Sequence, residues 1–376
     1  MKFVVAGYGS RGDIEPCAAV ALELLHRGHD VRTAVTPTML SFVESAGLAA
    51  VPYGPDSEAL LHDFVRMIQN PTSALPEVSE HIAQIKADKD TTLTALAEGA
   101  DLLMAGITEQ TLAANVADSC GVPLVGLHFF PPPIFGPESS AGPESSVGPE
   151  SSVGPLEIQA YDPLCFPGLA VQWAHGDGRR PFVGALTLEL PTHADDDIVS
   201  WIAAGTPPIY FGFGSTPITS AADTVTVISA VCAQLGERAL ICTGPNDCTG
   251  VPLLDHVKIV DTVNHTAVFP ACRAVVHHGG AGTTAAGLRA GIPTLILWNG
   301  LDQPIWAAAV TRLKVGSGRR FSESSTESLI ADLRLILAPR YASRARKVAA
   351  QMIKPAESRA RAADLLEKTA RRGRLG

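Results

Sequence analysis

The chain has 376 residues, of which 46% are hydrophobic and 18% charged, a composition typical of a globular protein with more than one core. Its 29 Lys and Arg against 38 Asp and Glu give a net charge of −9, which excludes binding to nucleic acid over the whole surface. No apolar run reaches the roughly 18 residues of a membrane-spanning helix, and the start lacks the apolar core of a signal peptide. We therefore expect a cytoplasmic protein.

The charge is unevenly distributed along the chain. Residues 340–376 hold 11 Lys or Arg against three acids, a net charge of +8, so residues 1–339 carry −17. The seven cysteines form no CxxC pair and share no spacing with histidines, which disfavours structural zinc and a disulfide framework. We expect no metal site and reduced, mostly buried thiols.

Short apolar runs alternate with helical patterns in the first half of the chain. Residues 2–6 and 31–35 are predicted strands around a helix at 16–27, which together form a β-α-β unit. Two further strands, at 101–105 and 123–127, flank a helix near 109–119. This alternation predicts the α/β class, with a doubly wound parallel sheet in a first domain of residues 1–189.

The same rhythm restarts after an acidic, Pro-bearing stretch and predicts a second α/β domain at 190–355. Its predicted strands are 208–213, 238–242, 257–260, 273–277 and 293–298, and its helices are 222–235, 265–270, 283–290 and 303–312. A last long helical segment covers about 340–371. We expect residues 356–376 to pack back on the first domain.

One segment breaks the pattern. Residues 136–155 repeat the motif Gly-Pro-Glu-Ser-Ser three times with a period of six residues, and they offer almost nothing to bury. A collagen-like helix is excluded because Gly recurs every sixth rather than every third residue. The composition predicts a flexible linker.

The first candidate site is a Gly-rich turn, Gly7-Tyr8-Gly9-Ser10-Arg11-Gly12, between a predicted strand and a helix. A dinucleotide site of this kind needs a carboxylate after the second strand, where the chain has Thr36-Pro37 instead. The turn rather presents Asp13 at the carboxyl end of the sheet. Asp13 is then either a general base or an N-cap of the helix.

The second candidate site lies in the second domain. The run from Val275 to Thr284 delivers His277 and His278 into a loop of small residues that opens a helix, whose free N–H groups and positive dipole end suit phosphate. The alternative is a core histidine with glycines that only allow tight packing. The turn Gly212-Phe213-Gly214-Ser215 is a weaker candidate for phosphate oxygens. Asp302 and Gln303 either bind sugar hydroxyls or, for Asp302, cap a helix.

These motifs together resemble bacterial nucleotide-sugar glycosyltransferases of the GT-B fold, which have two facing Rossmann-like domains. The resemblance rests on Gly9 to Pro16, Gly212 to Ser215, His277 to Thr283, Ala290 to Pro293, and Asp302-Gln303, and it covers almost the whole chain. Within the UDP-glycosyltransferase-like family, the chain is most similar to enzymes that glycosylate glycopeptide antibiotics and to mycobacterial enzymes that add deoxysugars to glycopeptidolipids.

The resemblance implies a role for each candidate residue. Asp13 corresponds to the base that deprotonates the acceptor hydroxyl, and Asp302 and Gln303 bind the donor sugar. Val263, Asn264 and His265 lie where the family binds the nucleobase. The donor diphosphate is held by Ser10, Arg11, Ser215, His278, Gly280, Gly282 and Thr283.

The resemblance also implies an inverting, metal-independent hexosyltransferase without a cofactor, acting as a monomer on a hydroxyl of a hydrophobic acceptor. Ala286 stands where plant-type relatives have a ribose-binding Glu, so a dTDP-sugar is as plausible a donor as a UDP-sugar. The repeat at 136–155 replaces helical segments that normally wall the acceptor pocket, whether by engineering or by natural degeneration.

Two other functions stay open at this point: a nucleotide-sugar-binding protein without transfer activity, and a nucleotide-sugar epimerase of the same architecture. The basic C-terminal segment likewise has two interpretations. It is either a solvated helix that packs on the first domain or a peripheral contact with anionic lipid.

Overall fold

The computed structural model describes residues 1–56, 71–131, 154–192, 195–214, 218, 220–248, 250–252 and 254–373. The chain divides into two compact units. The first comprises residues 1–161, 168–188 and 355–376, and the second comprises residues 162–167 and 189–354. Residues 162–167, which were predicted to be part of the first domain, belong to the second unit. Most of the repeat, residues 136–153, lies outside the described residues.

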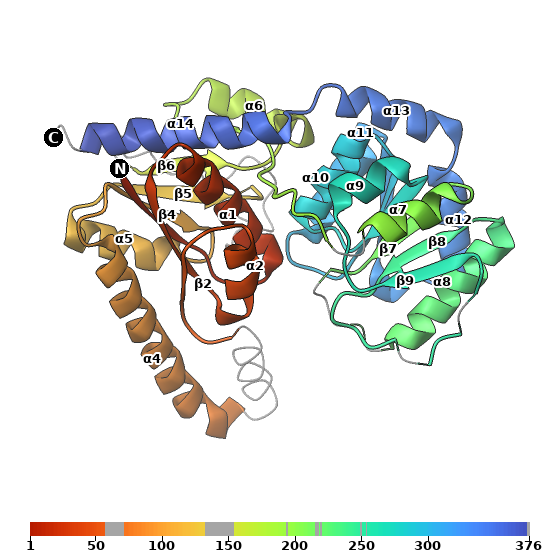
Figure 1. Ribbon diagram of the computed structural model, residues 1–376, viewed down its shortest axis with the longest axis horizontal. Coiled ribbons are helices and arrows are strands. Elements are labelled where there is room, and N and C mark those ends of the chain that lie inside the picture. Colours follow the sequence, from red (N-terminus) through yellow and green to blue (C-terminus); the bar gives the residue numbers. More distant parts are fainter. Residues whose placement is uncertain are drawn as a thin grey trace. The chain divides into compact units, whose positions relative to one another are not determined.

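The first unit is built on a parallel six-stranded sheet of order β3-β2-β1-β4-β5-β6 (Figure 1). Its strands are β1 (Lys2–Ala6), β2 (Asp30–Val35), β3 (Ala50–Pro52), β4 (Leu102–Gly106), β5 (Leu124–His128) and β6 (Leu156–Gln159). The predicted doubly wound α/β class is confirmed. The two edge strands, β3 and β6, were not predicted from the sequence.

Helices cover both faces of this sheet. They are α1 (Arg11–His26), α2 (Leu40–Ser45), α4 (Pro71–Ala97), α5 (Gln110–Cys120), α6 (Pro167–Ala174) and α14 (Pro355–Gly373), with a 3-10 turn at Pro37–Met39. Val4 and Ala6 of β1 pack in one core cluster with Leu93 of α4 and Ala113 of α5. Helices α1 and α14 contact the sheet as well as each other. Because side chains alternate along a strand, β1 has residues for both layers.

Helix α1 starts earlier than residues 16–27 predict. It begins at Arg11 with Ser10 as the N-cap, so Pro16 lies inside the helix. Proline is tolerated in the first turns of a helix, which is where Pro16 lies. The capping residues of the Gly-rich turn determine the start instead.

The second unit has another parallel six-stranded sheet, of order β12-β11-β10-β7-β8-β9. Its strands are β7 (Ile209–Gly212), β8 (Ala239–Cys242), β9 (Val257–Val260), β10 (Ala274–His277), β11 (Thr294–Trp298) and β12 (Gly316–Arg320). All of them were predicted from the sequence except β12, which is a polar edge strand.

The helices of this unit are α7 (Asp195–Ala203), α8 (Ala221–Leu235), α9 (His265–Val268), α10 (Ala281–Ala290), α11 (Gln303–Leu313), α12 (Thr326–Ile336) and α13 (Pro339–Ala349). Three 3-10 turns lie at Pro163–Cys165, Phe269–Ala271 and Phe321–Glu323. Phe211 and Val276 pack in one core cluster with α8 and α12. Tyr210 and Val275 pack on the opposite face with Ile198 of α7 and Val268 of α9.

The single long helix predicted at 340–371 is wrong. Helices α13 and α14 are separated by residues 350–354, and the second helix starts at Pro355. Proline disfavours helical backbone in the residue before it, which explains the break. The two helices belong to different units.

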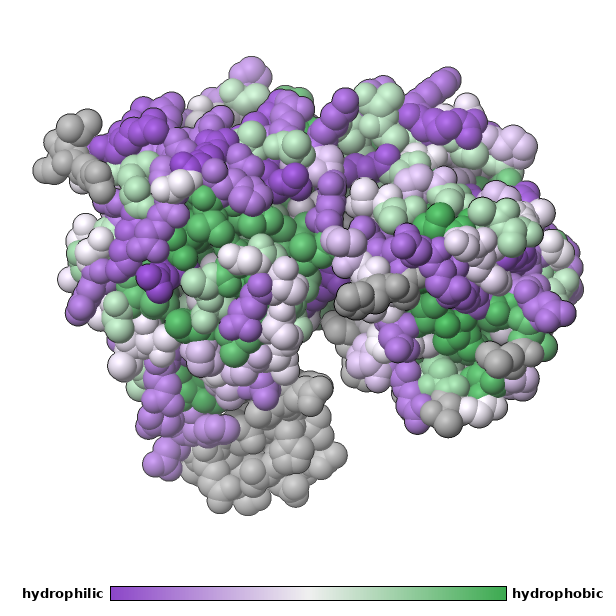
Figure 2. Space-filling view, viewed as in Figure 1, coloured by the Kyte–Doolittle hydropathy of each residue, from purple (hydrophilic) through white to green (hydrophobic). Residues whose placement is uncertain are grey.

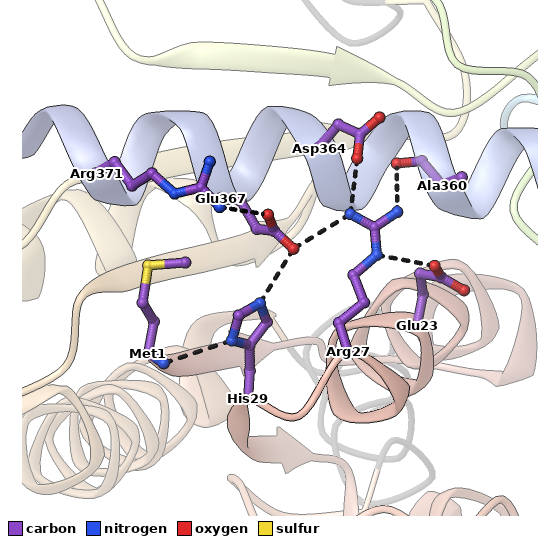
Figure 3. A network of polar contacts seen from close by, with 8 residues as sticks. All are labelled: Met1, Glu23, Arg27, His29, Ala360, Asp364, Glu367 and Arg371. Carbon is purple, nitrogen blue, oxygen red and sulfur yellow. Dashed lines mark hydrogen bonds and ion pairs between the residues drawn. The ribbon is translucent and has the colours of Figure 1, made fainter.

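Helix α14 packs on α1 through a network around Arg27 (Figure 3). The Arg27 guanidinium binds Glu23 of its own helix at 2.9 Å and Asp364 and Glu367 of α14 at 2.7 and 3.2 Å. It also donates to the Ala360 carbonyl at 3.2 Å. Hydrophilic side chains gather over the outer side of α14 in Figure 2.

Among the described residues, no helix is both long enough and apolar enough to cross a membrane.

We predict that Arg27→Met loosens α14 from the first unit. The arginine side chain is only 24% exposed and makes charged hydrogen bonds to three carboxylates, so its loss should cost about 1–3 kcal/mol. Limited proteolysis should then cut within α14 at lower temperature than in the parent. The control is Arg32→Met, because Arg32 and Asp30 form a pair that is 52% and 55% exposed and contributes little. Equal protection of α14 in both variants would contradict the prediction.

Candidate functional site

In both units the candidate residues follow the carboxyl ends of parallel strands, where open α/β sheets bind ligands. In the first unit, Gly7 to Ser10 connect β1 to α1. Asp13 lies at the third position of α1, and its Oδ2 accepts hydrogen bonds from the backbone N–H and hydroxyl of Ser10 at 2.8 and 3.1 Å. Ser10 is the N-cap, and Asp13 caps α1 as the third residue of a capping box rather than as the N-cap itself.

The turn has room for this carboxylate because residue 9 is glycine. A Cβ built on Gly9 would lie 2.7 Å from Cγ of Asp13, and the Gly9 φ of +133° disfavours any side chain. Asp13 as a whole is half-buried. The arrangement fixes the orientation of the acid at the edge of the sheet.

Two threonines that the sequence analysis did not select hold the same turn. The Thr36 hydroxyl accepts from the Gly9 N–H at 2.8 Å and donates to the Gly9 carbonyl at 3.1 Å. The Thr108 hydroxyl donates to the Tyr8 carbonyl at 3.0 Å. Thr36 thus stands where a dinucleotide site has its carboxylate, and its hydroxyl holds the Gly-rich turn by two hydrogen bonds. The feature of the sequence that could have indicated this role is a threonine shortly after β2 and another shortly after β4, the two strands that pair with β1.

Arg11 and Glu15 are engaged within the first unit. Arg11 binds Glu15 at 2.8 Å and its guanidinium lies 4.8 Å from the ring centre of Phe42. Glu15 also accepts the Leu188 N–H at 2.9 Å. Arg11 remains 45% exposed, so its guanidinium is accessible to an anion.

A buried ion pair ties together the loops at this edge of the sheet. Lys89 of α4 binds Glu109 at 2.8 Å, and the Tyr53 hydroxyl donates to the same carboxylate at 2.7 Å. The ammonium lies 3.9 Å from the ring centre of Tyr8. Burial lowers the pKa of Lys89 and raises that of Tyr8 to about 12, with Glu109 adding to the latter. This cluster was not predicted from the sequence, because its members are far apart in the chain.

In the second unit, β10 ends at His277 and delivers both histidines to the turn before α10. Nδ1 of His277 accepts the Gly279 N–H at 3.0 Å, whereas its buried Nε2 has no partner among the described residues. Burial lowers the pKa of His277 well below 6.5 and also lowers that of His278. Both rings are therefore neutral at pH 7. His277 is therefore a core residue. This agrees with the alternative interpretation of the motif, in which one of the two histidines belongs to the core.

Glycines surround the His278 ring. A Cβ built on Gly214 would lie 2.6 Å from Cε1 of His278, and one built on Gly280 would lie 2.6 Å from its Nε2. Gly280 is the N-cap of α10, so the N–H groups of Gly282 and Thr283 belong to the first turn and lack intrahelical acceptors. A Cβ on Gly282 would meet no atom within 4 Å. This geometry leaves N–H donors accessible beside an imidazole. Ser215 lies outside the described residues.

Asp302 and Gln303 form the start of α11, after β11. Oδ2 of Asp302 accepts the indole N–H of Trp306 at 3.0 Å, and burial raises the Asp302 pKa while this hydrogen bond lowers it. Asp302 occupies the N-cap position, but its side chain makes no capping hydrogen bond. Gln303 Oε1 accepts the N–H groups of Asn299 and Gly300 at 2.8 and 3.4 Å. Its carbonyl oxygen therefore holds the loop, which leaves the amide N–H₂ as the group suited to a ligand.

The predicted nucleobase segment precedes and begins α9. Val263 is buried in the core, so its side chain is not available to a ligand. The Asn264 side chain caps α9 by accepting the Thr266 N–H at 3.0 Å. The His265 ring stacks on Phe269 with ring centres 4.4 Å apart. A ligand at this segment would therefore contact backbone groups and the edge of the His265 ring.

Among the residues that the structure describes, no three His, Cys, Asp or Glu side chains gather in a group that could hold a metal ion.

Two family models match the chain. The Glycosyltransferase family 28 N-terminal domain matches residues 3–107, and the Erythromycin biosynthesis protein CIII-like C-terminal domain matches residues 230–367. The first match includes the Gly-rich turn and Asp13. The second includes both histidines, α10 and Asp302.

The chain is similar to known proteins over its whole length. A protein of Mycobacterium tuberculosis, described as an uncharacterized glycosyltransferase, is 56% identical over 421 residues that cover 100% of both chains. The vancomycin aglycone glucosyltransferase of Amycolatopsis orientalis is 27% identical over 93% of each chain. The crystal structure of the Streptomyces glycosyltransferase SsfS6 with thymidine diphosphate superposes with a TM-score of 0.65 at 21% identity, over 98% of this chain and 99% of that one.

We predict that the second unit loses stability as the pH falls below about 6.5. The unfolded chain protonates its histidines near 6.5, whereas the lowered pKa values of His277 and His278 keep both neutral in the fold. The loss should approach about 1.4 kcal/mol per pH unit for each histidine. Denaturation followed by tryptophan fluorescence reports mainly this unit, because Trp201, Trp298 and Trp306 lie in it.

The variant His278→Asn should make the stability of the second unit less sensitive to pH between 7 and 5. The control is His175→Asn, since His175 is exposed and lies in the first unit. An unchanged slope in His278→Asn would contradict the prediction.

Proposed function

Because the chain belongs to the GT-B glycosyltransferases, we propose that it moves a hexose or deoxyhexose from a UDP- or dTDP-sugar to a hydroxyl of a hydrophobic acceptor. The observation that carries this proposal is the turn in the second unit, where the half-buried imidazole of His278 lies beside the N-terminus of α10. Neutral N–H donors around a helix N-terminus are suited to a diphosphate.

In this proposal His278, Gly280, Gly282 and Thr283 hold the donor diphosphate, together with Ser215. As the bond from the anomeric carbon to the diphosphate oxygen breaks, negative charge grows on that oxygen. Fixed N–H donors stabilise this charge without reorganisation, and they can do so without a metal. Ser10 and Arg11 add donors from the first unit.

The nucleotide is the next part of the donor. SsfS6 was crystallised with thymidine diphosphate, which supports a dTDP-sugar. Ala286 in α10 offers no carboxylate for a ribose 2′-hydroxyl, so the site tolerates deoxyribose. Backbone groups of Val263 and Asn264 and the ring of His265 would face the base. Asp302 and the amide N–H₂ of Gln303 would bind sugar hydroxyls.

Asp13 supplies the base. Its carboxylate takes the proton of the acceptor hydroxyl while that oxygen attacks the anomeric carbon, and the nucleoside diphosphate leaves from the opposite face. One displacement inverts the anomeric configuration. Ser10 holds Oδ2 of the carboxylate in place during the reaction.

Fewer observations bear on the acceptor than on the nucleotide-sugar donor. The vancomycin aglycone glucosyltransferase acts on an aglycone, as its name states, which supports a natural-product or lipid hydroxyl. The 421 positions aligned with the M. tuberculosis relative exceed the 376 residues of this chain, so that relative has segments without a counterpart here.

We also propose that contact with anionic lipid occurs through α13. Residues 334–356 contain no acid, and Arg340, Arg344 and Lys347 are exposed at helical spacing on α13. Arg344 donates to the Leu313 carbonyl, which brings it next to the exposed Lys314. By contrast, cations of α14 pair with Glu357 and Glu367. Like charges at such spacing repel, and an anionic surface would relieve this repulsion.

We predict that Asp13→Asn abolishes sugar transfer but keeps donor binding. Asn retains the side-chain oxygen that Ser10 binds, so α1 stays capped, whereas the loss of the base should lower the rate about 10²- to 10⁴-fold. Transfer to hydroxyls of a lipid extract is measured by mass spectrometry, and binding by the thermal shift with dTDP and UDP.

Transfer by Asp13→Asn at the parental rate would overturn the assignment of the base. A parent that binds dTDP or UDP but forms no product with any acceptor supports the nucleotide-sugar-binding alternative. Epimerised donor recovered without acceptor supports the epimerase.

We predict that the triple charge reversal of Arg340, Arg344 and Lys347 to Glu lowers binding to vesicles with anionic lipid at least about ten-fold. The matched control reverses Arg361, Lys368 and Arg372 on α14, with the same change in net charge, and should retain binding. Co-sedimentation at two salt concentrations is the measurement. Three results would contradict a role of α13. The parent does not bind the vesicles, its binding does not depend on salt, or both charge reversals weaken binding equally.

A further inference from the structure

Thr36 is a fully buried residue directly after β2, and its hydroxyl reaches the Gly-rich turn of the neighbouring strand. Main-chain contact between β1 and β2 extends to the Gly7 N–H, which donates to the Ala34 carbonyl at 3.0 Å. Two residues further along, the Thr36 hydroxyl accepts the Gly9 N–H at 2.8 Å and donates to the Gly9 carbonyl at 3.1 Å. The hydroxyl therefore continues the contact of the two strands past their ends.

These two hydrogen bonds hold the peptide groups on both sides of Gly9. The N–H belongs to the peptide group between Tyr8 and Gly9, and the carbonyl belongs to the one between Gly9 and Ser10. Glycine has more accessible backbone conformations than any other residue, and Gly9 adopts one with φ of +133° that side chains disfavour. One hydroxyl thus fixes the residue of the turn that has the greatest freedom to rotate.

The peptide group between Gly9 and Ser10 also holds Asp13. Its carbonyl oxygen accepts the hydrogen bond from Thr36, and its N–H donates to Oδ2 of Asp13 at 2.8 Å. A trans peptide group is planar and rigid, and its carbonyl and N–H point in opposite directions. Hydrogen bonds arranged in series through such a group also polarise one another. The Thr36 hydroxyl therefore sets the direction of the donor that holds the carboxylate.

We propose that Thr36 is a positioning residue for sugar transfer: its hydroxyl fixes the peptide group between Gly9 and Ser10, and that group fixes the carboxylate of Asp13. The inference rests on the proposed function, in which Asp13 takes the proton of the acceptor hydroxyl. Proton transfer needs the carboxylate within hydrogen-bond reach of that hydroxyl, so a carboxylate that rotates is less often productive. Because Thr36 is buried, it acts through Asp13 and affects the rate of transfer rather than the binding of the donor.

Strand β2 contains a matched control for a purely structural role. Thr33 is 1% exposed, and its hydroxyl donates to the Ala49 carbonyl at 2.8 Å, so this bond joins β2 to the residue before β3. Replacing either threonine with valine removes a buried hydroxyl and keeps the branched shape of the side chain. Both variants should lose stability, but only the change at Thr36 acts on the turn that holds Asp13.

The test compares the parent with Thr36→Val, Thr36→Ser and Thr33→Val, and repeats the Thr36→Val change in the Asp13→Asn variant. Thr36→Ala takes the place of Thr36→Val if the valine variant does not fold. The donors are dTDP-glucose, dTDP-6-deoxyglucose and UDP-glucose, with a fixed amount of lipid extract as the acceptor. Mass spectrometry of the products gives the apparent kcat and the KM for the donor, and the thermal shift with dTDP reports nucleotide binding.

We expect Thr36→Val to lower kcat about ten-fold, with the KM for the donor and the thermal shift with dTDP unchanged. Thr36→Ser keeps the hydroxyl and should retain kcat within about two-fold of the parent, and Thr33→Val should retain it as well. In the Asp13→Asn variant, Thr36→Val should cause no further loss, because the group that Thr36 positions no longer acts as a base.

Four results would overturn the role of Thr36 while transfer by the parent leaves the proposed function intact. Thr36→Val keeps the parental kcat, Thr33→Val lowers kcat as much as Thr36→Val, Thr36→Ser is as slow as Thr36→Val, or Thr36→Val slows the Asp13→Asn variant by the same factor as the parent. A parent that forms no product with any of the three donors overturns the proposed function itself, and this inference with it.

Discussion

The candidate site depends on glycines that let a functional side chain lie against the backbone. Asp13 occupies the space that a Cβ on Gly9 would take, and His278 occupies the space next to Gly214 and Gly280. In each unit the glycine-bearing turn follows a buried strand, so the sheet fixes the turn and the turn fixes the side chain. Any side chain at these glycines would displace the acid or the imidazole before it changed the fold.

The two units would contribute to the proposed sugar transfer by different kinds of interaction. In the proposed reaction, the second unit relies on backbone N–H groups and a neutral, half-buried imidazole, which meet the charge of a diphosphate without adding a full cation. The first unit instead contributes one carboxylate, held by its own N-cap, and surrounds the turn with threonine clamps. The proposed base must point at one hydroxyl, so its fixed orientation matters more than its burial.

Strands in the centre of both sheets could be predicted from the sequence because they are apolar runs between turns. The missed strands β3, β6 and β12 lie at edges, where pairing on one side and exposure on the other allow polar or very short segments. The motif residues could also be found, since glycines and histidines cluster in sequence. The Thr36 clamp and the Lys89–Glu109 pair could not, because only the tertiary fold brings residues 27 and 20 positions apart into contact.

The register of the first sheet explains why the repeat at 136–155 is compatible with this fold. Strands β5 and β6 pair in parallel, with Val125 opposite Leu156 and His128 opposite Gln159. Such a connection needs only a crossover of about a dozen residues, and the entropy of closing a longer one grows slowly with length. The segment between His128 and Leu156 is longer than that minimum, so pairing constrains its ends and not its composition. The second unit has its own core and does not depend on this segment. A change there therefore leaves the core of the second unit unaffected.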